Sequence, residues 1–292
     1  MFNISVLQEP ESLESAVELL HAHSGLRIIA GGTDVLIRLQ HGGEGWSELL
    51  SLRNIKELEG VSLRADGTIV IGATTPFAKL FLDPIIRQHL PSLAEAAVSM
   101  GGPQIRNVAT IGGNICNGAV SGDSASTLFA LDALLKLNRL GSERIIPIHE
   151  FYAGPGKVHL QPGEMLTAVL VPRDSYQDTG GHYIKFAMRK AMDIATLGVS
   201  VICRVRDGAF QDLRIGLGVA APVPIRCAEA EAYARGRQVT AECCREIGKL
   251  AVKASKARTS WRASKDYREH LIEVLTERAV LEAAQRAGGP KC

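Results

Sequence analysis

The chain has 292 residues, of which 46% are hydrophobic, and its 33 basic and 31 acidic side chains leave a formal net charge of +2. This length suits two domains, and the near balance of charge gives no reason to expect a nucleic-acid partner. No apolar run approaches the ~20 residues of a membrane-spanning helix, and Met1–Ser5 does not resemble a signal peptide, so we expect a cytoplasmic protein without a membrane partner.

The first half of the chain alternates helical and strand patterns. A helix is predicted after Ser12, which can cap it, because apolar residues recur there at helical spacing. A short apolar strand over 27–30 ends in Gly31-Gly32, and a helix is predicted over 33–39. The further elements predicted before residue 173 are a loop at 42–45, strands at 49–52 and 68–72 with an Asp66-Gly67 turn before the second, helices at 77–82 and 91–100, a strand at 109–111, a helix at 124–131, and strands at 134–138, 144–148 and 167–171.

A polar segment at 173–181 predicts a domain boundary. We expect a first domain over 1–176, with subdomains of about 1–54 and 55–176, and a second domain over 182–292. The second domain should contain strands at 183–188, 198–205 and 213–220, a hairpin at 206–209, and helices at 240–254 and 265–287. The pattern predicts an α+β protein.

The six cysteines are scattered at positions 116, 203, 227, 243, 244 and 292. Their spacing predicts no disulfide framework, zinc site or iron–sulfur site. The neighbours Cys243 and Cys244 could form a redox couple, although two ordinary helix cysteines are the simpler interpretation. No metal-binding residues are predicted.

Two glycine-rich segments carry most of the chemical information, Arg27–Asp34 and Ala109–Asp123. Glycine lacks a Cβ, so the backbone can approach a ligand closely and present its N–H groups to a phosphate. Either pair alone could be an ordinary tight turn. Together with the short polar side chains beside them, they favour a diphosphate-containing nucleotide. Neither the Gly-x-Gly-x-x-Gly fingerprint nor a P-loop is present, so the fold should be a different one.

The segments Ile28–Val35 and Ala109–Asp123, with Gly102–Ala109 leading into the second, resemble the FAD-binding domain of molybdenum hydroxylases. That domain shares the two-subdomain, PCMH-like fold of vanillyl-alcohol-oxidase-type flavoproteins. Later segments resemble the separate FAD subunit of the bacterial xanthine dehydrogenase branch: Gly154–Val158, Lys185–Arg189, Met192–Ala195, Gly218–Arg226 and Ser260–Ser264. The resemblance covers the whole chain and implies a C-terminal α+β domain with a three-stranded antiparallel sheet and helices.

The glycine segments and the resemblance together predict a non-covalent FAD site and no catalytic residue. Its predicted members are Arg27, Ile28, Ile29, Ala30, Gly31, Gly32, Thr33, Asp34, Ala109, Thr110, Ile111, Gly112, Gly113, Asn114, Asn117, Asp123, Leu166 and Lys185. Asp123 would accept hydrogen bonds from hydroxyls, or it could cap the helix that follows. The resemblance alone assigns Leu166 and Lys185, and a lysine there would favour the anionic reduced flavin; the alternative for Lys185 is a solvated charge on a strand.

Two further points come from the resemblance. Several relatives have an aromatic residue packed on the flavin where this chain has Met100, whose thioether can cover a ring but cannot stack on it. Arg189 and Asp193 fall on the loop that borders the nicotinamide pocket in relatives, or they form only a salt bridge with each other.

The resemblance implies an electron-transfer subunit of a xanthine dehydrogenase complex. It would take electrons from a 2Fe-2S small subunit and reduce NAD, while hypoxanthine and xanthine are oxidised to urate at molybdopterin on a large subunit. The three chains would form a heterotrimer, alone or as a dimer of trimers. The alternatives are the flavin subunit of a carbon monoxide or aldehyde dehydrogenase, and a nucleotide-binding scaffold without redox turnover.

Overall fold

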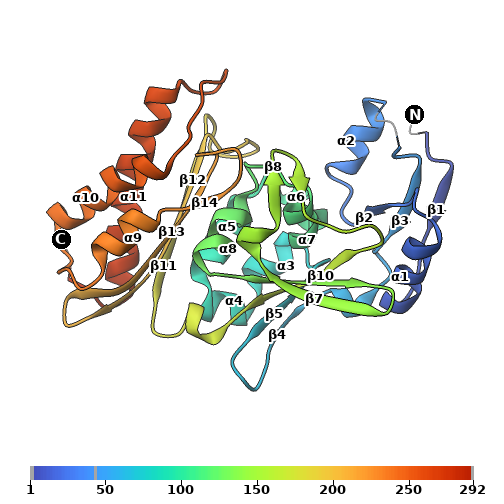
Figure 1. The fold of residues 1–292 in the computed structure, drawn as a ribbon, viewed down its shortest axis with the longest axis horizontal. Coiled ribbons are helices and arrows are strands. Elements are labelled where there is room, and N and C mark those ends of the chain that lie inside the picture. Colours follow the sequence, from blue (N-terminus) through green and yellow to red (C-terminus); the bar gives the residue numbers. More distant parts are fainter. Residues whose placement is uncertain (1–2, 43–44, 291–292) are drawn as a thin grey trace.

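The computed structural model describes residues 3–42 and 45–290, which form three larger sheets in succession, with helices between and around them, and a small two-stranded sheet (Figure 1). The N-terminal part is a parallel sheet of order β1-β3-β2. Its elements are β1 (Val6–Gln8), α1 (Leu13–Ala22), β2 (Arg27–Ile29), α2 (Val35–Gln40) and β3 (Glu48–Ser51). Ser12 caps α1 as predicted, by accepting from the Ser15 N–H at 3.2 Å. Gly43 and Glu44 of the predicted 42–45 loop lie outside the described residues.

The middle part is a five-stranded antiparallel sheet of order β4-β5-β10-β6-β7. The strands of this sheet are β4 (Val61–Leu63), β5 (Ile69–Gly72), β6 (Leu134–Arg139), β7 (Ser142–Pro147) and β10 (Met165–Val171). The strands β8 (Tyr152–Gly154) and β9 (Lys157–Val158) pair with each other in a separate antiparallel sheet. The short 3₁₀ helices of this part are η1 (Lys56–Leu58), η2 (Ile148–Glu150) and η3 (Arg173–Ser175). Its helices are α3 (Phe77–Leu82), α4 (Pro84–His89), α5 (Pro91–Ser99), α6 (Pro103–Val108), α7 (Ile111–Cys116) and α8 (Asp123–Ala130). One hydrophobic core joins this sheet to most of these helices.

The C-terminal part is an antiparallel sheet of order β11-β12-β13-β14, with α10 and α11 on its outer face (Figure 1). The elements are β11 (Gly180–Phe186), β12 (Leu197–Arg206), β13 (Ala209–Gly218), β14 (Ile225–Arg226), α9 (Ala228–Ala234), α10 (Ala241–Ala254) and α11 (Lys265–Arg286). The α+β class and the antiparallel C-terminal sheet are therefore confirmed, and the short strand β14 extends the three predicted strands to four. Asp207 and Gly208 both have positive φ, at 51° and 73°, as the predicted hairpin requires.

The middle and C-terminal parts meet where α5 and α8 lie against the four-stranded sheet. A Cβ at Gly216 on β13 would overlap the carbonyl oxygen of Ser126 on α8, so only glycine allows this approach. Glu95 on α5 adds a polar link, because its carboxylate accepts from His182 at 2.9 Å and from the Tyr183 N–H at 2.8 Å on β11, and from Arg286 at 2.6 Å on α11. The β11–α11 pair is thereby tied to α5.

One sequence prediction is wrong in this region. The strand expected at 109–111 is reduced to a single bridge between Thr110 and Pro76, and α7 begins at Ile111. The cause is local: Thr110 caps the helix by accepting from the Gly113 N–H at 3.1 Å, so the glycine pair lies in the first turn of α7. Cys243 and Cys244 both lie on α10, so the prediction that they are helix residues is confirmed. In the described part of the chain, every helix is too short or too polar to cross a membrane.

Candidate functional site

The two glycine-rich segments lie against each other. A Cβ at Gly31 would overlap the carbonyl oxygen of Val108, just before the second segment, and a Cβ at Gly112 would lie 2.6 Å from the carbonyl oxygen of Ala73. At these two positions the missing Cβ therefore lets two parts of the protein backbone pack together. The sequence had predicted instead that it lets the backbone approach a ligand. Gly32 has φ +74° and supplies the left-handed conformation that turns the chain from β2 into α2.

The first segment presents unused backbone donors. The N–H groups of Gly31, Gly32, Thr33 and Asp34 donate to no acceptor within the described residues. Successive free N–H groups at a turn are donors of the kind that bind phosphate oxygens. This segment fits the diphosphate of a dinucleotide.

In the second segment, the backbone N–H groups of both glycines already have acceptors within the protein, but one side of the segment is open. The Gly112 N–H donates to Ala73 at 2.8 Å and the Gly113 N–H to Thr110 at 3.1 Å, so neither is free for a ligand. A Cβ at Gly113 would meet only the Thr110 hydroxyl within 4 Å, at 2.9 Å. The Asn114 oxygen accepts from Ser124 at 2.8 Å, while its amide nitrogen has no acceptor among the described residues. The open face beside Gly113 and the free amide of Asn114 can accommodate a bound cofactor.

A buried ion pair lies behind this segment. Lys185 on β11 donates to Asp123 Oδ2 at 2.8 Å and to the Ser99 carbonyl at 3.1 Å, and the side chains of Lys185 and Asp123 are 11% and 6% exposed. The Tyr183 hydroxyl reaches Asp123 Oδ1 at 3.3 Å. Burial raises the pKa of Asp123, although Lys185 and Tyr183 act in the opposite direction, and burial together with Asp123 raises the pKa of Tyr183 well above its usual value.

The structure answers questions that the sequence left open about Asp123, Lys185 and the Arg189–Asp193 pair. Asp123 does not cap α8: Gly122 holds the cap position, and the carboxylate in the first turn faces Lys185 and Tyr183. Lys185 is not a solvated strand charge, because its side chain is largely shielded from solvent and is paired with Asp123. Arg189 and Asp193 do bond each other, since the Asp193 carboxylate accepts from the Arg189 N–H at 2.9 Å and lies 3.5 Å from its guanidinium.

That loop contacts the segment that follows Met100. The Met192 N–H donates to the Gly101 carbonyl at 3.2 Å, and the Met192 sulfur occupies the space that a Cβ at Gly102 would take. Met100 packs partly buried at the edge of the middle core, and its carbonyl accepts from Arg106 at 3.0 Å. The residues flanking Met100 thus join α5, the 189–193 loop and, through the Ser99 carbonyl, Lys185.

The other predicted residues have mixed surroundings. Arg27, Ile28 and Ile29 form β2 and Ala30 follows it, while Ala109, Ile111 and Leu166 are buried in the middle core. Both polar atoms of the Asn117 amide are engaged, with Asp34 and with Arg38. The sequence analysis missed Arg38 and Tyr183. A lone arginine one turn into a helix and a tyrosine on a strand carry no local signal for such contacts.

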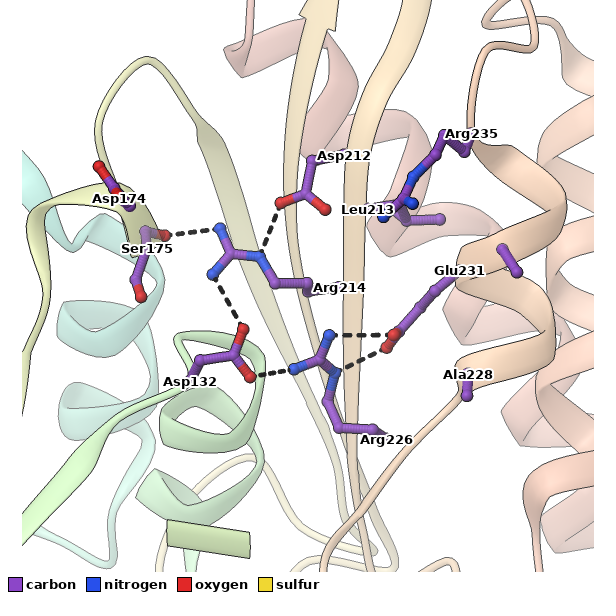
Figure 2. Close-up of a pocket in the computed structure, with 11 residues that line it drawn as sticks. Asp132, Asp174, Ser175, Asp212, Leu213, Arg214, Arg226, Ala228, Glu231 and Arg235 are labelled. Atoms are coloured by element: carbon purple, nitrogen blue, oxygen red, sulfur yellow. Dashed lines mark hydrogen bonds and ion pairs between the residues drawn. The ribbon is translucent and has the colours of Figure 1, made fainter. Parts of the chain in front are cut away.

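A cavity of about 440 Å³ lies elsewhere, where the end of α8, β13 and α9 meet (Figure 2). Asp132 bridges Arg214 at 3.5 Å and Arg226, and Arg226 also forms a two-point pair with Glu231. Arg214 donates to the Ser175 carbonyl at 2.7 Å and lies 2.9 Å from Asp212. Since both guanidiniums are matched by carboxylates, this cluster holds elements together and is not the candidate site.

Comparisons with known proteins agree with the geometry. Residues 2–174 match the family described as "FAD binding domain in molybdopterin dehydrogenase", and residues 182–283 match "CO dehydrogenase flavoprotein C-terminal domain". The chain is 43% identical over 289 residues to the "Putative xanthine dehydrogenase FAD-binding subunit XdhB" of Escherichia coli K12, covering 99% of each protein. It is 31% identical to the carbon monoxide dehydrogenase medium chain of Hydrogenophaga pseudoflava, covering 95% of this chain and 96% of that protein. A solved structure of carbon monoxide dehydrogenase from the same organism has a TM-score of 0.92 at 29% identity, covering 98% of this chain and 99% of that chain.

Proposed function

The chain belongs to the FAD-binding subunits of the molybdenum hydroxylases, and from this premise we propose that it is the electron-transfer subunit of a xanthine dehydrogenase complex. It would accept electrons from a 2Fe-2S small subunit and pass them to NAD, while a molybdopterin-containing large subunit oxidises hypoxanthine and xanthine to urate. Such a complex would be a cytoplasmic heterotrimer.

The observation that carries this choice is the 43% identity over essentially the whole of both chains, compared with 31% to a carbon monoxide dehydrogenase medium chain. The difference favours a xanthine dehydrogenase over a sibling complex. We also propose that the chain divides within 173–181, into an FAD domain over 1–176 and a C-terminal domain over 182–292.

Each part of the proposed FAD site has a stated task. The free N–H groups of Gly31–Asp34 would bind the diphosphate, and the Asn114 amide with the Thr110 hydroxyl hydrogen would serve phosphate or ribityl oxygens. Lys185 would bring positive charge to the flavin, in balance with Asp123. Bound FAD supplies the redox chemistry, because it can exchange electrons singly with iron–sulfur clusters and as a hydride with NAD.

The test uses the purified chain loaded with FAD. We expect about one FAD per chain, released by acid, and loss of the flavin absorbance when NADH is added without oxygen. Flavin that stays with the acid precipitate would contradict non-covalent binding. An FAD-loaded protein that NADH does not bleach would favour another electron acceptor and a sibling complex, and a protein that takes up no FAD would leave only the scaffold alternative.

A further inference from the structure

The two glycine-rich segments are joined by a small set of side chains. Arg38, in the last turn of α2, donates to the Asn117 oxygen at 2.5 Å, and the Asn117 amide nitrogen donates to Asp34 Oδ1 at 3.0 Å. Asp34 directly precedes α2 and Asn117 directly follows α7, so the three side chains connect both ends of α2 to the end of α7. The Arg38 guanidinium also lies 5.0 Å from the centre of the Trp46 ring.

These are the only hydrogen bonds between residues 27–42 and 101–123 that the described part of the chain makes. Gly31 also packs closely on Val108, and this contact limits how near the two segments come. Hydrogen bonds are directional, so the three side chains add a constraint on the relative orientation of the segments.

The Arg38 guanidinium is suited to hold Asn117 by a charge-assisted hydrogen bond. Within the described residues it pairs with no carboxylate, so its charge remains available to strengthen the bond to the Asn117 oxygen. Asn117 can serve both neighbours at once because an amide has a donor and an acceptor. An aspartate or an alanine at 117 would lose one or both of these bonds.

We propose that Arg38, Asn117 and Asp34 form a clasp that fixes the two glycine-rich segments relative to each other before FAD binds. Arg38 and Asn117 are then positioning residues of the cofactor site: they hold the free N–H groups of 31–34 at a set distance from the open face beside Gly113. The inference rests on the proposed FAD site.

The experiment measures FAD affinity and the state of the clasp separately. Arg38→Ala, Asn117→Ala and the double variant are made in a Trp261→Phe background, which leaves Trp46 as the only tryptophan. Titration of the FAD-free proteins gives the dissociation constant, and Trp46 fluorescence of the same FAD-free proteins reports the position of Arg38. Arg53→Ala is the matched control, because this exposed guanidinium forms no hydrogen bond or ion pair with the described residues.

We expect each single variant to raise the FAD dissociation constant about 10-fold, the value of one charge-assisted hydrogen bond. The double variant should bind FAD no more than about twofold worse than either single variant, because each single substitution already breaks the same set of hydrogen bonds. Trp46 emission should change in both single variants without FAD, and Arg53→Ala should leave both readouts within about twofold of the parent.

Three outcomes would overturn the clasp. In the first, Arg38→Ala weakens FAD binding and Asn117→Ala does not, which would mean that Arg38 contacts FAD directly. In the second, the two effects multiply to about 100-fold, which would mean that they act independently. In the third, neither variant changes Trp46 emission in the FAD-free protein. If the parent protein itself takes up no FAD, the proposed site fails, and the Trp46 readout still tests the clasp.

Discussion

Lys185 Nζ lies 2.8 Å from Asp123 Oδ2, and the two side chains are 11% and 6% exposed. The charge that the resemblance assigns to the flavin is therefore already balanced within the protein. Lys185 also donates to the Ser99 carbonyl, and the Tyr183 hydroxyl bonds Asp123. A change at Lys185 therefore acts directly on Asp123 and Ser99, and on Tyr183 through Asp123, as well as on any cofactor.

The first prediction concerns this pair. Lys185→Ala should lower the free energy of unfolding by about 3–5 kcal/mol, because it leaves a buried carboxylate unpaired. The double variant Lys185→Met with Asp123→Asn should recover most of that loss. Urea unfolding measures both, with Lys253→Ala as the control, since the Lys253–Glu229 pair is 61% and 60% exposed and should be worth less than about 1 kcal/mol. A Lys185→Ala protein as stable as the parent would show that the pair is not buried in solution.

The second prediction separates two kinds of glycine. Gly31→Ala should lower the melting temperature markedly, because its Cβ would overlap backbone at Val108 that cannot move aside. Gly113→Val should leave a folded protein with weaker FAD retention, because a Cβ at this position would meet only the Thr110 hydroxyl of the described residues and the two methyl groups would be added on the proposed cofactor side. Thermal unfolding and the flavin-to-protein absorbance ratio distinguish them. Normal FAD content in folded Gly113→Val would place the cofactor elsewhere.

The third prediction is a pH dependence at Glu95. Burial would raise the pKa of Glu95, but the hydrogen bonds from His182, the Tyr183 N–H and Arg286 outweigh burial and leave the pKa below its usual 4.5. A carboxyl with a lowered pKa in the folded state stabilises the fold above its unfolded pKa, and that contribution is lost as pH falls through the folded value. Glu95→Gln should therefore be less stable than the parent near neutral pH, and the difference should shrink as pH falls below 4.5. A difference that is constant across this range would contradict the assignment.

The fourth prediction uses two aspartates that both have positive φ. Asp132 and Asp178 have φ of 46° and 55°, yet Asp132 bridges Arg214 and Arg226, while the Asp178 carboxylate accepts, among the described residues, only from Gln177. Asparagine tolerates this conformation, so the substitution changes charge and not strain. Asp132→Asn should cost about 1 kcal/mol, since Asp132 is half exposed, and Asp178→Asn should stay within about 0.5 kcal/mol of the parent. Equal effects in urea unfolding would show that the cluster in Figure 2 adds no stability.

The sequence predicted best where one local pattern decides the structure. Ser12 and Thr240 cap their helices as expected, and Asp207-Gly208 makes the expected hairpin between two long strands whose β-branched residues are buried, except for the partly buried Val205. The strand expected at 109–111 failed because Thr110 and Ile111 favour strands locally, while the Thr110 cap and the approach of Gly112 to Ala73 are contacts made in the folded chain.

The candidate site shows the same division. The paired glycines and Asp34 were visible because their composition is unusual for a short segment. Tyr183 and Arg38 were not, since their partners lie 60 and 79 residues away and no pattern around either residue signals them. Tertiary partners of single residues are beyond what one sequence can indicate.

The backbone-on-backbone contacts at Gly31, Gly180 and Gly216 have a consequence for how this chain can vary. At each, an added Cβ would overlap main-chain atoms, of Val108, Ala283 and Ser126 respectively. A side-chain neighbour can be exchanged for a smaller one to make room, but a peptide unit has no smaller version. In a library of every single substitution, these three positions should reject all nineteen replacements even under selection for folded protein alone, whereas Gly141 and Gly236, with open space around them, should tolerate asparagine despite their positive φ.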